Sequence, residues 1–380
     1  MTCNHQSNPQ WGSDITYCRL CGKPHWYRQW ELVQWIGSGS FAHVYLGKSK
    51  QREAIIKIYK DDIALKDRLI EIRNLYIAAL FHTAPMPIEA SEYAVVMEYV
   101  ARTQGLGIKE DIKALLESLN RLHNRGLVHR DIKPENIIRT AGGTRIIDYG
   151  IMVDITKDFD AEVYGTPGYV PQEGFNPAIP VSSKLDSYAA GIVLSLWLGA
   201  PPSSGDMTTF GLPQGWTAPQ EYHDLLQGLT MSNPFTRWTC GRAFSSLLPT
   251  IYKGLGIDLV TAKEYQNYTG LTCQENHGYA VGLTIEEMEG YCRATNTTLP
   301  SLQQLKQCAT GIQTEHKRLS ANDQWDNGLI SDSGHRHLHY CLWQPTLEGV
   351  CYGGSWYVSS TVQTIPFEPN SMVGFRVATF

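Results

Sequence analysis

Short stretches of alternating polar and apolar residues follow a polar N-terminal tail. Residues 30–37, 43–49 and 53–60 combine this alternation with β-branched side chains, which predicts three successive strands. Residues 61–80 carry apolar side chains at helical spacing and predict an amphipathic helix, whereas residues 93–100 predict a short buried strand. We therefore expect a β-rich region with one helix near the start of the chain.

Helical periodicity dominates the middle of the chain. Residues 109–125 repeat apolar positions at helical spacing, and residues 183–199 are apolar enough for a core helix. The length of this second segment, and Asp186 within it, exclude a membrane span there. Helices are expected to continue to about residue 252.

The texture of the sequence changes after residue 253. Residues 253–275 contain glycines and polar tracts, residues 283–297 and 300–312 predict two helices, and the end of the chain is rich in Gly, Trp and Tyr. These changes predict an N-terminal segment at 1–28, a domain at 29–255, a linker at 256–275 and a C-terminal domain at 276–380.

Composition narrows the possible partners. A chain of 380 residues with 42% hydrophobic residues suits two domains with sizeable cores. Its formal net charge of -5 does not favour nucleic acid or a membrane as a partner. The N-terminus lacks the basic and apolar regions of a secretory signal, so a cytoplasmic location is expected. Nine cysteines, an odd number, argue against a disulfide framework.

A run of small residues lies between the first two expected strands. Small side chains at such a turn allow backbone N–H groups to approach nucleotide phosphates, although an ordinary hairpin turn would use similar residues. The candidate phosphate-binding residues are Gly37, Ser38, Gly39, Ala42 and Val44.

A lysine interrupts the third apolar strand. Lys57 is costly in that position unless a carboxylate compensates its charge. Glu71 in the following helix is the preferred partner, and Asp67 is the alternative. A lysine held in this way is suited to binding the α- and β-phosphates of ATP.

Four polar residues in residues 128–150 complete a set for phosphoryl transfer. Asp131 is placed to accept or orient a substrate hydroxyl, and Lys133 to neutralise the transferring phosphate. Asn136 and Asp148 supply the oxygen ligands that Mg²⁺ prefers. The ordered set predicts an enzyme that uses ATP and Mg²⁺.

Residues 30 to about 255 resemble the eukaryotic-like protein kinases found in bacteria. The stretch 129–136, HRDIKPEN, is similar to the Ser/Thr-specific catalytic loop, and this resemblance implies a bilobal kinase fold and a protein substrate. It also implies that Thr166 contacts Lys133 and Asp131, and that Glu173 pairs with Arg237. Further implied roles are Met97 as gatekeeper, Glu98 to Val100 as adenine-binding hinge, Asp186 as support of the catalytic loop, and Leu75, His129 and Tyr149 as a hydrophobic spine.

This sequence departs from the kinase pattern at three positions. Ala42 replaces a glycine, Tyr149 replaces a phenylalanine, and the triplet Pro171-Gln172-Glu173 replaces Ala-Pro-Glu, with Gln172 in the place of the proline. None of these residues performs the chemistry, so an active enzyme is favoured over an inactive kinase fold.

Acidic residues are concentrated in the expected activation segment. Arg130 precedes the catalytic aspartate, a position at which such kinases often bind a phosphorylated residue of that segment. We expect the acidic residues to replace a phosphate in part; phosphorylation of Thr156 or Thr166 is the alternative. These acidic residues are Asp154, Asp158, Asp160 and Glu162.

Two glycine-rich motifs frame the end of the chain, at 351–356 and 374–378. They resemble the C-type-lectin fold of formylglycine-generating-enzyme-like proteins and the variable proteins of diversity-generating retroelements. The resemblance implies a protein ligand on an exposed face, with an ordinary lectin-like fold as the alternative; the region lacks the cysteine pair of the oxidases. The expected face residues are Tyr357, Ser359, Ser360, Thr361, Thr364, Phe367 and Ser371, whereas Trp356, Phe375 and Val377 are expected in the core.

The N-terminal segment carries a possible zinc site. Cys18 and Cys21 have the spacing of a zinc knuckle, and Cys3 and His5 could complete a tetrahedral set. His25 is a rival fourth ligand, and a tail without metal is the alternative.

The expected fold class is therefore α+β: a bilobal protein-kinase fold, a C-type-lectin-like domain after it and a small zinc-knuckle-like segment before it. The preferred function is an ATP-dependent Ser/Thr kinase whose lectin-like domain directs or regulates it. The alternatives are a ligand-binding protein with a scaffolding kinase fold and, less favoured, a sugar-binding lectin.

Overall fold

A computed structural model describes most of the chain up to residue 249 and shorter stretches beyond it. The described residues are 14–50, 52–156, 164–202, 211–249, 251–252, 255–256, 259–276, 279–281, 283–301, 304–305, 344–345, 350–353, 363–366, 376 and 378. They divide into two units: one holds the chain up to Asp111 and His129–Val153, and the other holds Ile112–Val128 and the chain from Asp154 onward. Within these described ranges, no helix has the length and apolar character needed to cross a membrane.

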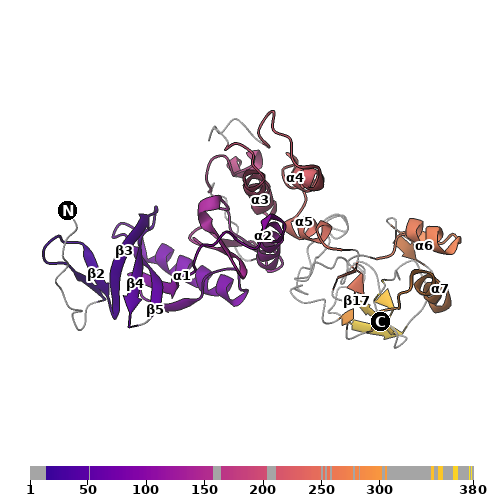
Figure 1. The fold of residues 1–380 in the computed structure, drawn as a ribbon, viewed down its shortest axis with the longest axis horizontal. Helices are drawn as coiled ribbons and strands as arrows, with labels where there is room; N and C mark the ends of the chain where they lie inside the picture. The colour runs from indigo at the N-terminus through magenta and orange to yellow at the C-terminus, as the bar shows by residue number, and fades with distance from the viewer. Residues whose placement is uncertain are drawn as a thin grey trace. The chain divides into compact units, whose positions relative to one another are not determined.

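A seven-stranded sheet in the order β1-β2-β3-β4-β5-β7-β6 dominates the first unit (Figure 1). Every neighbouring pair in it is antiparallel. The strands are β1 (Ile15–Tyr17), β2 (Pro24–Tyr27), β3 (Trp30–Ser38), β4 (Ala42–Ser49), β5 (Arg52–Tyr59), β6 (Pro87–Ala90) and β7 (Ala94–Glu98). The three strands expected from alternation correspond to β3, β4 and β5, and the expected short buried strand corresponds to β7, so all four are confirmed.

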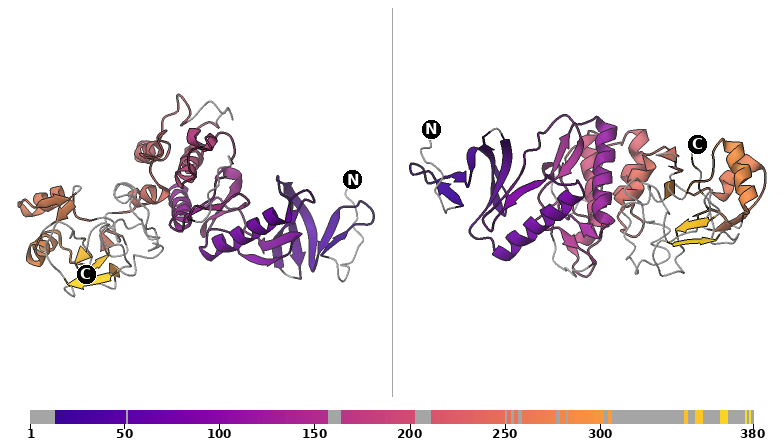
Figure 2. Two further views of the ribbon diagram at one scale, coloured as in Figure 1. Left: turned by 180° about the vertical axis from the view of Figure 1, so that it is seen from behind. Right: turned by 90° about the horizontal axis from the view of Figure 1, so that it is seen from below.

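Helix α1 (Leu65–Leu80) is the helix expected after the third strand, and it lies beside the sheet in both views of Figure 2. It buries Glu71, Asn74 and Leu75, so its inward face carries two polar residues as well as apolar ones. From His129 onward, the first unit continues with a 3₁₀ turn, η1 (Pro134–Asn136), and the hairpin of β9 (Ile137–Thr140) and β10 (Gly143–Ile146).

The N-terminal residues extend the sheet, which the sequence analysis did not predict. Strands β1 and β2 form a hairpin, and β2 pairs with β3 through Trp26 opposite Glu31 and Tyr27 opposite Trp30. Side chains fasten the hairpin to the other end of the sheet, because Glu89 on β6 accepts hydrogen bonds from Arg28 at 3.1 Å and from the Trp30 indole at 2.5 Å. Residues 14–27 are therefore part of the sheet.

Helices make up most of the second unit before residue 250. Its elements are α2 (Ile108–His123), β8 (Leu127–Val128), β11 (Val153–Asp154), η2 (Gln172–Phe175), α3 (Lys184–Trp197), η3 (Gln220–Tyr222), α4 (His223–Leu229) and α5 (Cys240–Ser246). Helix α3 is buried along most of its length, which confirms the core helix expected at 183–199. A methyl group at Gly191 would lie 2.6 Å from Thr230 Cγ2, so glycine permits the close approach of α3 to the end of α4.

Asp186 in α3 is buried and faces a histidine. Its carboxylate lies 2.9 Å from Nε2 of His123 at the end of α2. Burial opposes a charge on the ring, but hydrogen bonds to Asp186 and Cys240 outweigh this effect and raise the pKa of His123 to about 9. The pair therefore joins α2 to α3 as a buried ion pair.

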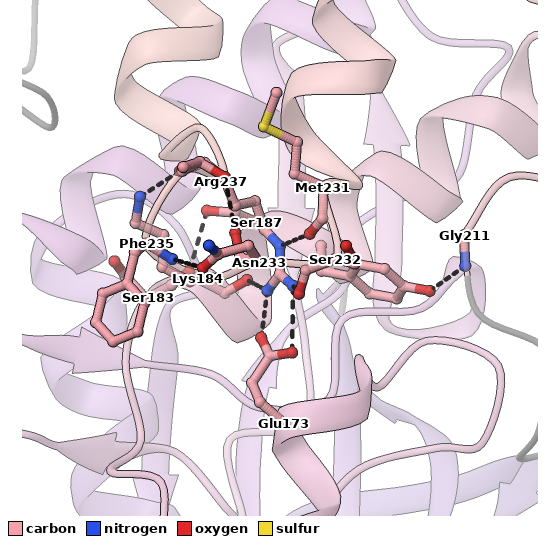
Figure 3. A network of polar contacts seen from close by, with 12 residues as sticks. Glu173, Ser183, Lys184, Ser187, Gly211, Met231, Ser232, Asn233, Phe235 and Arg237 are labelled. Carbon is pink, nitrogen blue, oxygen red and sulfur yellow. Dashed lines mark hydrogen bonds and ion pairs between the residues drawn. The ribbon is translucent and has the colours of Figure 1, made fainter.

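Arg237 organises a second buried network (Figure 3). Its guanidinium donates to both carboxylate oxygens of Glu173, at 2.5 and 3.2 Å, which confirms the predicted pair. It also donates to the carbonyl oxygens of Met231, Lys184 and Ser232 at 2.7, 3.0 and 3.2 Å. One fully buried side chain thus fastens the loop 231–237 to η2 and α3.

The chain beyond residue 250 contains a separate small core. Its elements are β12 (Ile251–Tyr252), β13 (Leu255–Gly256), α6 (Ala262–Thr269), β14 (Gln274–Asn276), β15 (Tyr279–Val281), α7 (Ile285–Thr295), β16 (Gln344–Pro345), β17 (Val350–Gly353) and β18 (Gln363–Pro366). Helix α7 confirms the first helix expected in this region, whereas most of the second, at 300–312, lies outside the described residues.

The expected linker contains part of this core. Helix α6 begins with a capping box in which Thr261 and Glu264 bond each other's backbone N–H, and it ends at Gly270 with a φ of 72°. Tyr265 stacks on Tyr291 of α7 with ring centroids 6.1 Å apart. Residues 260–273 therefore pack with the C-terminal region. The sequence did not indicate this helix, because a short polar helix with one buried aromatic residue has too weak a hydrophobic period to be recognised.

Replacing Arg237 with methionine tests the buried network. Arg237→Met would leave the Glu173 carboxylate buried without its cation, so we expect a loss of about 3–5 kcal/mol in the free energy of unfolding. Arg242→Met is the matched control, since Arg242 is half-buried and its guanidinium lies over the Trp238 ring at 4.6 Å. Urea unfolding of both variants measures the difference, and equal losses would contradict the assignment.

Candidate active site

Lys57 is the centre of the candidate active site. It lies in β5 between β4 and β7, opposite Val44 and Val95, so its side chain leaves a central strand of the sheet. Its ammonium group contacts the carboxylate of Glu71 on α1 and lies 3.0 Å from Asp148 Oδ1. Asp67, the alternative partner, is exposed. The buried lysine therefore has the compensation that its position requires.

Burial and charge together set the protonation of this group of three residues. Burial opposes the charge on Lys57, but Glu71 and Asp148 outweigh it and raise the pKa of Lys57. Burial also raises the pKa of Glu71, and Lys57 counteracts this only in part. At Asp148 the attraction of Lys57 outweighs burial and lowers the pKa of the carboxyl. Lys57 and Asp148 are therefore both charged at neutral pH.

The hairpin of β9 and β10 brings the two expected magnesium ligands to one end of the sheet strands. Asn136 directly precedes β9, and residues 147–148 directly follow β10. Because the strands are antiparallel, these ends meet, and the backbone N–H of Ile147 donates to the carbonyl oxygen of Asn136 at 2.9 Å. Two residues twelve positions apart in sequence are thus neighbours.

The Asp131 carboxylate accepts hydrogen bonds from both Lys133 and Asn136. Lys133 Nζ lies 2.7 Å from Asp131 Oδ2, and Asn136 Nδ2 donates to that oxygen and to the Asp131 carbonyl oxygen, both at 2.9 Å. These contacts fix the direction of the Asp131 carboxylate. They also engage the nitrogen of the Asn136 amide, so its oxygen is the atom suited to a metal ion.

The backbone around these residues adopts unusual conformations. Arg130 and Asp148 have φ angles of 69° and 68°, which non-glycine residues rarely adopt. His129 stacks edge-on to Tyr149 at 4.9 Å between ring centroids, and both side chains are buried, as is Leu75. The expected spine residues are therefore all buried, with His129 and Tyr149 in contact.

The small residues between β3 and β4 form a tight turn. Gly39 N–H donates to the Ala42 carbonyl oxygen at 3.0 Å. No atom lies within 4 Å of the position that a Cβ would take at Gly37 or Gly39, so the turn has open space around its backbone. Val44 follows on β4, directly opposite Lys57.

The expected hinge begins at the end of β7. Met97 is buried on this strand. Glu98 N–H donates to the Met86 carbonyl oxygen at 2.9 Å, and its carboxylate accepts from Met86 N–H at 3.0 Å. Val100 follows two residues later and is half-buried. The adenine-binding roles of Glu98 and Val100 stay predictions.

Tyr59 is a neighbour of this site that the sequence analysis missed. It lies two residues after Lys57, on the same face of β5, and its side chain is buried. Burial, together with the Glu71 and Asp148 carboxylates, raises the pKa of Tyr59, so its hydroxyl remains protonated. A hydroxyl two positions from a buried lysine was a usable signal.

The predicted activation-segment residues are only partly described. Thr156 donates its hydroxyl to Asp154 at 2.6 Å, and Arg130 donates to the Ile151 carbonyl oxygen at 2.5 Å. Asp158, Asp160 and Glu162 lie outside the described residues. Thr166 belongs to the second unit, so its predicted contacts with Lys133 and Asp131 stay predictions.

The zinc prediction also falls partly outside the described residues, which do not include Cys3 and His5. Cys18 and Cys21 lie at the turn of the β1–β2 hairpin, where Gly22 N–H donates to the Cys18 carbonyl oxygen at 2.8 Å. The rival ligand His25 is buried 3.5 Å from Glu31. Across the described ranges, no cluster of three or more His, Cys, Asp or Glu residues could hold a metal ion. The zinc site stays a prediction.

Comparison with known proteins identifies the family. The model of the protein kinase domain matches residues 30–247, so the chain belongs to the protein kinase family. Serine/threonine-protein kinase zyg-8 of Caenorhabditis elegans is 25% identical, over 56% of this chain and 32% of that protein. Serine/threonine-protein kinase AfsK of Streptomyces coelicolor is 28% identical, over 46% of this chain and 25% of that protein.

A third relative is the delta subunit of calcium/calmodulin-dependent protein kinase type II from Oryctolagus cuniculus. It is 29% identical, over 41% of this chain and 32% of that protein. The chain thus spans about a third or less of the length of these three relatives. The expected kinase domain is confirmed by the family match.

Removing the lysine should expose the cost of the buried glutamate. Lys57→Met leaves Glu71 without its cation, so the pKa of Glu71, already raised, should rise further. A raised pKa in the folded state gives stability that is lost as pH rises. We therefore expect urea unfolding to show a loss of about 3–5 kcal/mol near about pH 7 and a smaller loss near about pH 5.

Two further variants make this comparison specific. Lys48→Met removes an exposed lysine of β4, 3.8 Å from Glu53, and should change stability little at either pH. The double variant Lys57→Met with Glu71→Leu removes the uncompensated carboxylate and should regain part of the loss. A loss for Lys57→Met that is independent of pH would contradict the argument.

Proposed function

We propose that this chain is an ATP-dependent protein Ser/Thr kinase. The observation that carries the proposal is the placement of Lys57, Glu71 and Asp148 in direct contact, with Asp131, Lys133 and Asn136 joined by hydrogen bonds. The family match and the names of the relatives support the same activity. Lys133 occupies the position at which the catalytic loop of residues 129–136 resembles the Ser/Thr-specific version. This resemblance favours Ser and Thr over Tyr as acceptors.

Each residue of the set has a distinct role in the proposed reaction. Lys57 binds the α- and β-phosphates of ATP, and Glu71 holds the lysine in place. Asp131 orients the acceptor hydroxyl and takes its proton, while Lys133, 2.7 Å from that carboxylate, stabilises charge on the transferring phosphate. The Gly37–Gly39 turn covers the phosphates with its backbone.

The donor set fits Mg²⁺. Asp148 offers a carboxylate that is 41% exposed, and Asn136 offers the amide oxygen that its hydrogen bonds to Asp131 leave aside. Magnesium prefers such oxygen ligands and keeps waters and phosphates as its others. Bound there, the ion would neutralise charge on the nucleotide phosphates.

Phosphoryl transfer by the purified chain tests the proposal. With Mg²⁺ and labelled ATP, the chain should phosphorylate itself or a basic carrier protein on Ser or Thr. Asp131→Asn should lower the rate by about 10²–10⁴-fold, the usual contribution of a positioned base, and Asp148→Asn should also abolish transfer in a folded protein.

Asp224→Asn, at a side chain that is 91% exposed on α4, should leave the rate unchanged. Wild-type rates in the Asp131 and Asp148 variants would overturn the assignment. A folded wild type that binds nucleotide and transfers no phosphate would favour the alternative, a kinase fold that serves as a scaffold for ligand binding.

We further propose that the C-terminal region binds a protein ligand and directs or regulates the kinase. The frame motifs at 351–356 and 374–378 support this proposal, as does the separate hydrophobic core around α6 and α7. The side chains of the expected contact set lie outside the described residues; this set is Tyr357, Ser359, Ser360, Thr361, Thr364, Phe367 and Ser371.

Thermal unfolding distinguishes contact residues from core residues. Tyr357→Ala combined with Phe367→Ala should lower the melting temperature by only a few degrees, since surface changes cost under about 0.5 kcal/mol each. Trp356→Ala should destabilise the chain by about 3–5 kcal/mol. Comparable losses from the two variants would place Tyr357 and Phe367 in the core and refute the binding face.

A further inference from the structure

Asn74 is a buried amide that the phosphoryl-transfer set does not include. It lies three residues after Glu71 on the inward face of α1 and is 1% exposed. Its Nδ2 donates to the carbonyl oxygens of Tyr149 and Met152 at 3.0 and 2.9 Å. Both hydrogens of the amide are therefore used on the segment that follows Asp148.

The direction of this amide is set by its neighbour. Arg73 donates from its guanidinium to Asn74 Oδ1, at 3.1 Å for the shorter of two contacts. A guanidinium has no acceptor, so the atom that it contacts must be the amide oxygen, and the nitrogen must face the two carbonyls. The Asn74 amide can therefore adopt only one of its two flipped orientations.

The segment that Asn74 holds is a tight turn. Met152 N–H donates to the Tyr149 carbonyl oxygen at 3.3 Å, which closes the turn, and Arg130 donates to the Ile151 carbonyl oxygen. Asp148, immediately before the turn, has a φ of 68°. Such a conformation is costly for a residue other than glycine, so the surrounding contacts must hold it.

We infer that Asn74 is a positioning residue that ties the orientation of Asp148 to helix α1. The helix then contacts the Asp148 region twice: through Glu71, by way of Lys57, and through the Asn74 amide. If α1 moves away, the turn loses two hydrogen-bond donors and Asp148 loses support for its backbone conformation. Presentation of the metal-binding carboxylate thus depends on the helix that carries Glu71. This inference rests on the proposed function of Asp148.

Metal-dependent nucleotide binding tests this inference without relying on catalysis. Binding of a fluorescent ADP analogue to the full chain is titrated with Mg²⁺ and repeated in a chelator. Asn74→Leu removes the two donors at similar volume, so the Mg²⁺ concentration for half-maximal binding should rise about tenfold, as expected for the loss of two net hydrogen bonds. Binding in the chelator should stay unchanged.

Thr83→Val is the matched control. Thr83 is fully buried three residues after the end of α1 and donates its hydroxyl to the Ala78 carbonyl oxygen at 2.9 Å. Its backbone carbonyl accepts from Ile146 N–H at 2.8 Å, and Thr83→Val keeps this bond. This variant also loses a buried donor, so its stability should fall, and its Mg²⁺ dependence should match the wild type. A purely structural role for Asn74 predicts the same behaviour in Asn74→Leu, and that result would overturn the inference.

Two other variants keep the test decisive if Asn74→Leu fails to fold. Asn74→Gln retains an amide donor, whereas Asn74→Asp places an acceptor against two carbonyl oxygens. The Asp variant should need at least about tenfold more Mg²⁺ than the Gln variant, and equal requirements would contradict the inference. A wild type that shows no Mg²⁺-dependent nucleotide binding would instead remove the proposed function.

Discussion

The charge of Lys57 is the constraint on which the first unit depends. An ammonium group that leaves a central strand of a sheet is costly unless carboxylates approach it, and here two do so from different elements. Glu71 brings α1 against β5, and Asp148 brings the end of β10 to the same point. The compensation of one buried charge thus also assembles the site, because each partner is itself a functional group.

The second unit also compensates a buried charge, at a position outside the phosphoryl-transfer set. Arg237 is fully buried and donates hydrogen bonds to Glu173 and to three backbone carbonyl oxygens. Such a network has one satisfied arrangement, since a guanidinium displaced by a fraction of its length leaves several polar groups unpaired. It therefore fixes the loop 231–237 more sharply than apolar packing alone would.

Sequence reasoning succeeded where a residue type was out of place for its environment. A lysine in an apolar strand predicted Glu71 as its partner, and the ordered polar residues of 128–150 predicted the other residues of the phosphoryl-transfer set. It failed where the pattern was short or the polar residue was hidden in a regular period. Asn74 occupies an inward position of an amphipathic helix, and nothing in helical spacing shows whether such an amide has buried partners. The β1–β2 hairpin is too short to show alternation, and its cysteines suggested metal instead of a strand.

That hairpin changes the mechanical setting of the Gly37–Gly39 turn. Strand β3 carries the turn at its end, and without the hairpin it would be an edge strand along its whole length. Strand β2 pairs only with the first residues of β3, where Glu89 also fixes Arg28 and Trp30. Among the described residues, β3 beyond that point is paired on one side, by β4, and Val33, Trp35 and Ile36 are exposed there. Backbone paired on both sides resists displacement more than backbone paired on one, so the hairpin braces the base of the strand and leaves its phosphate-binding end the more adjustable part.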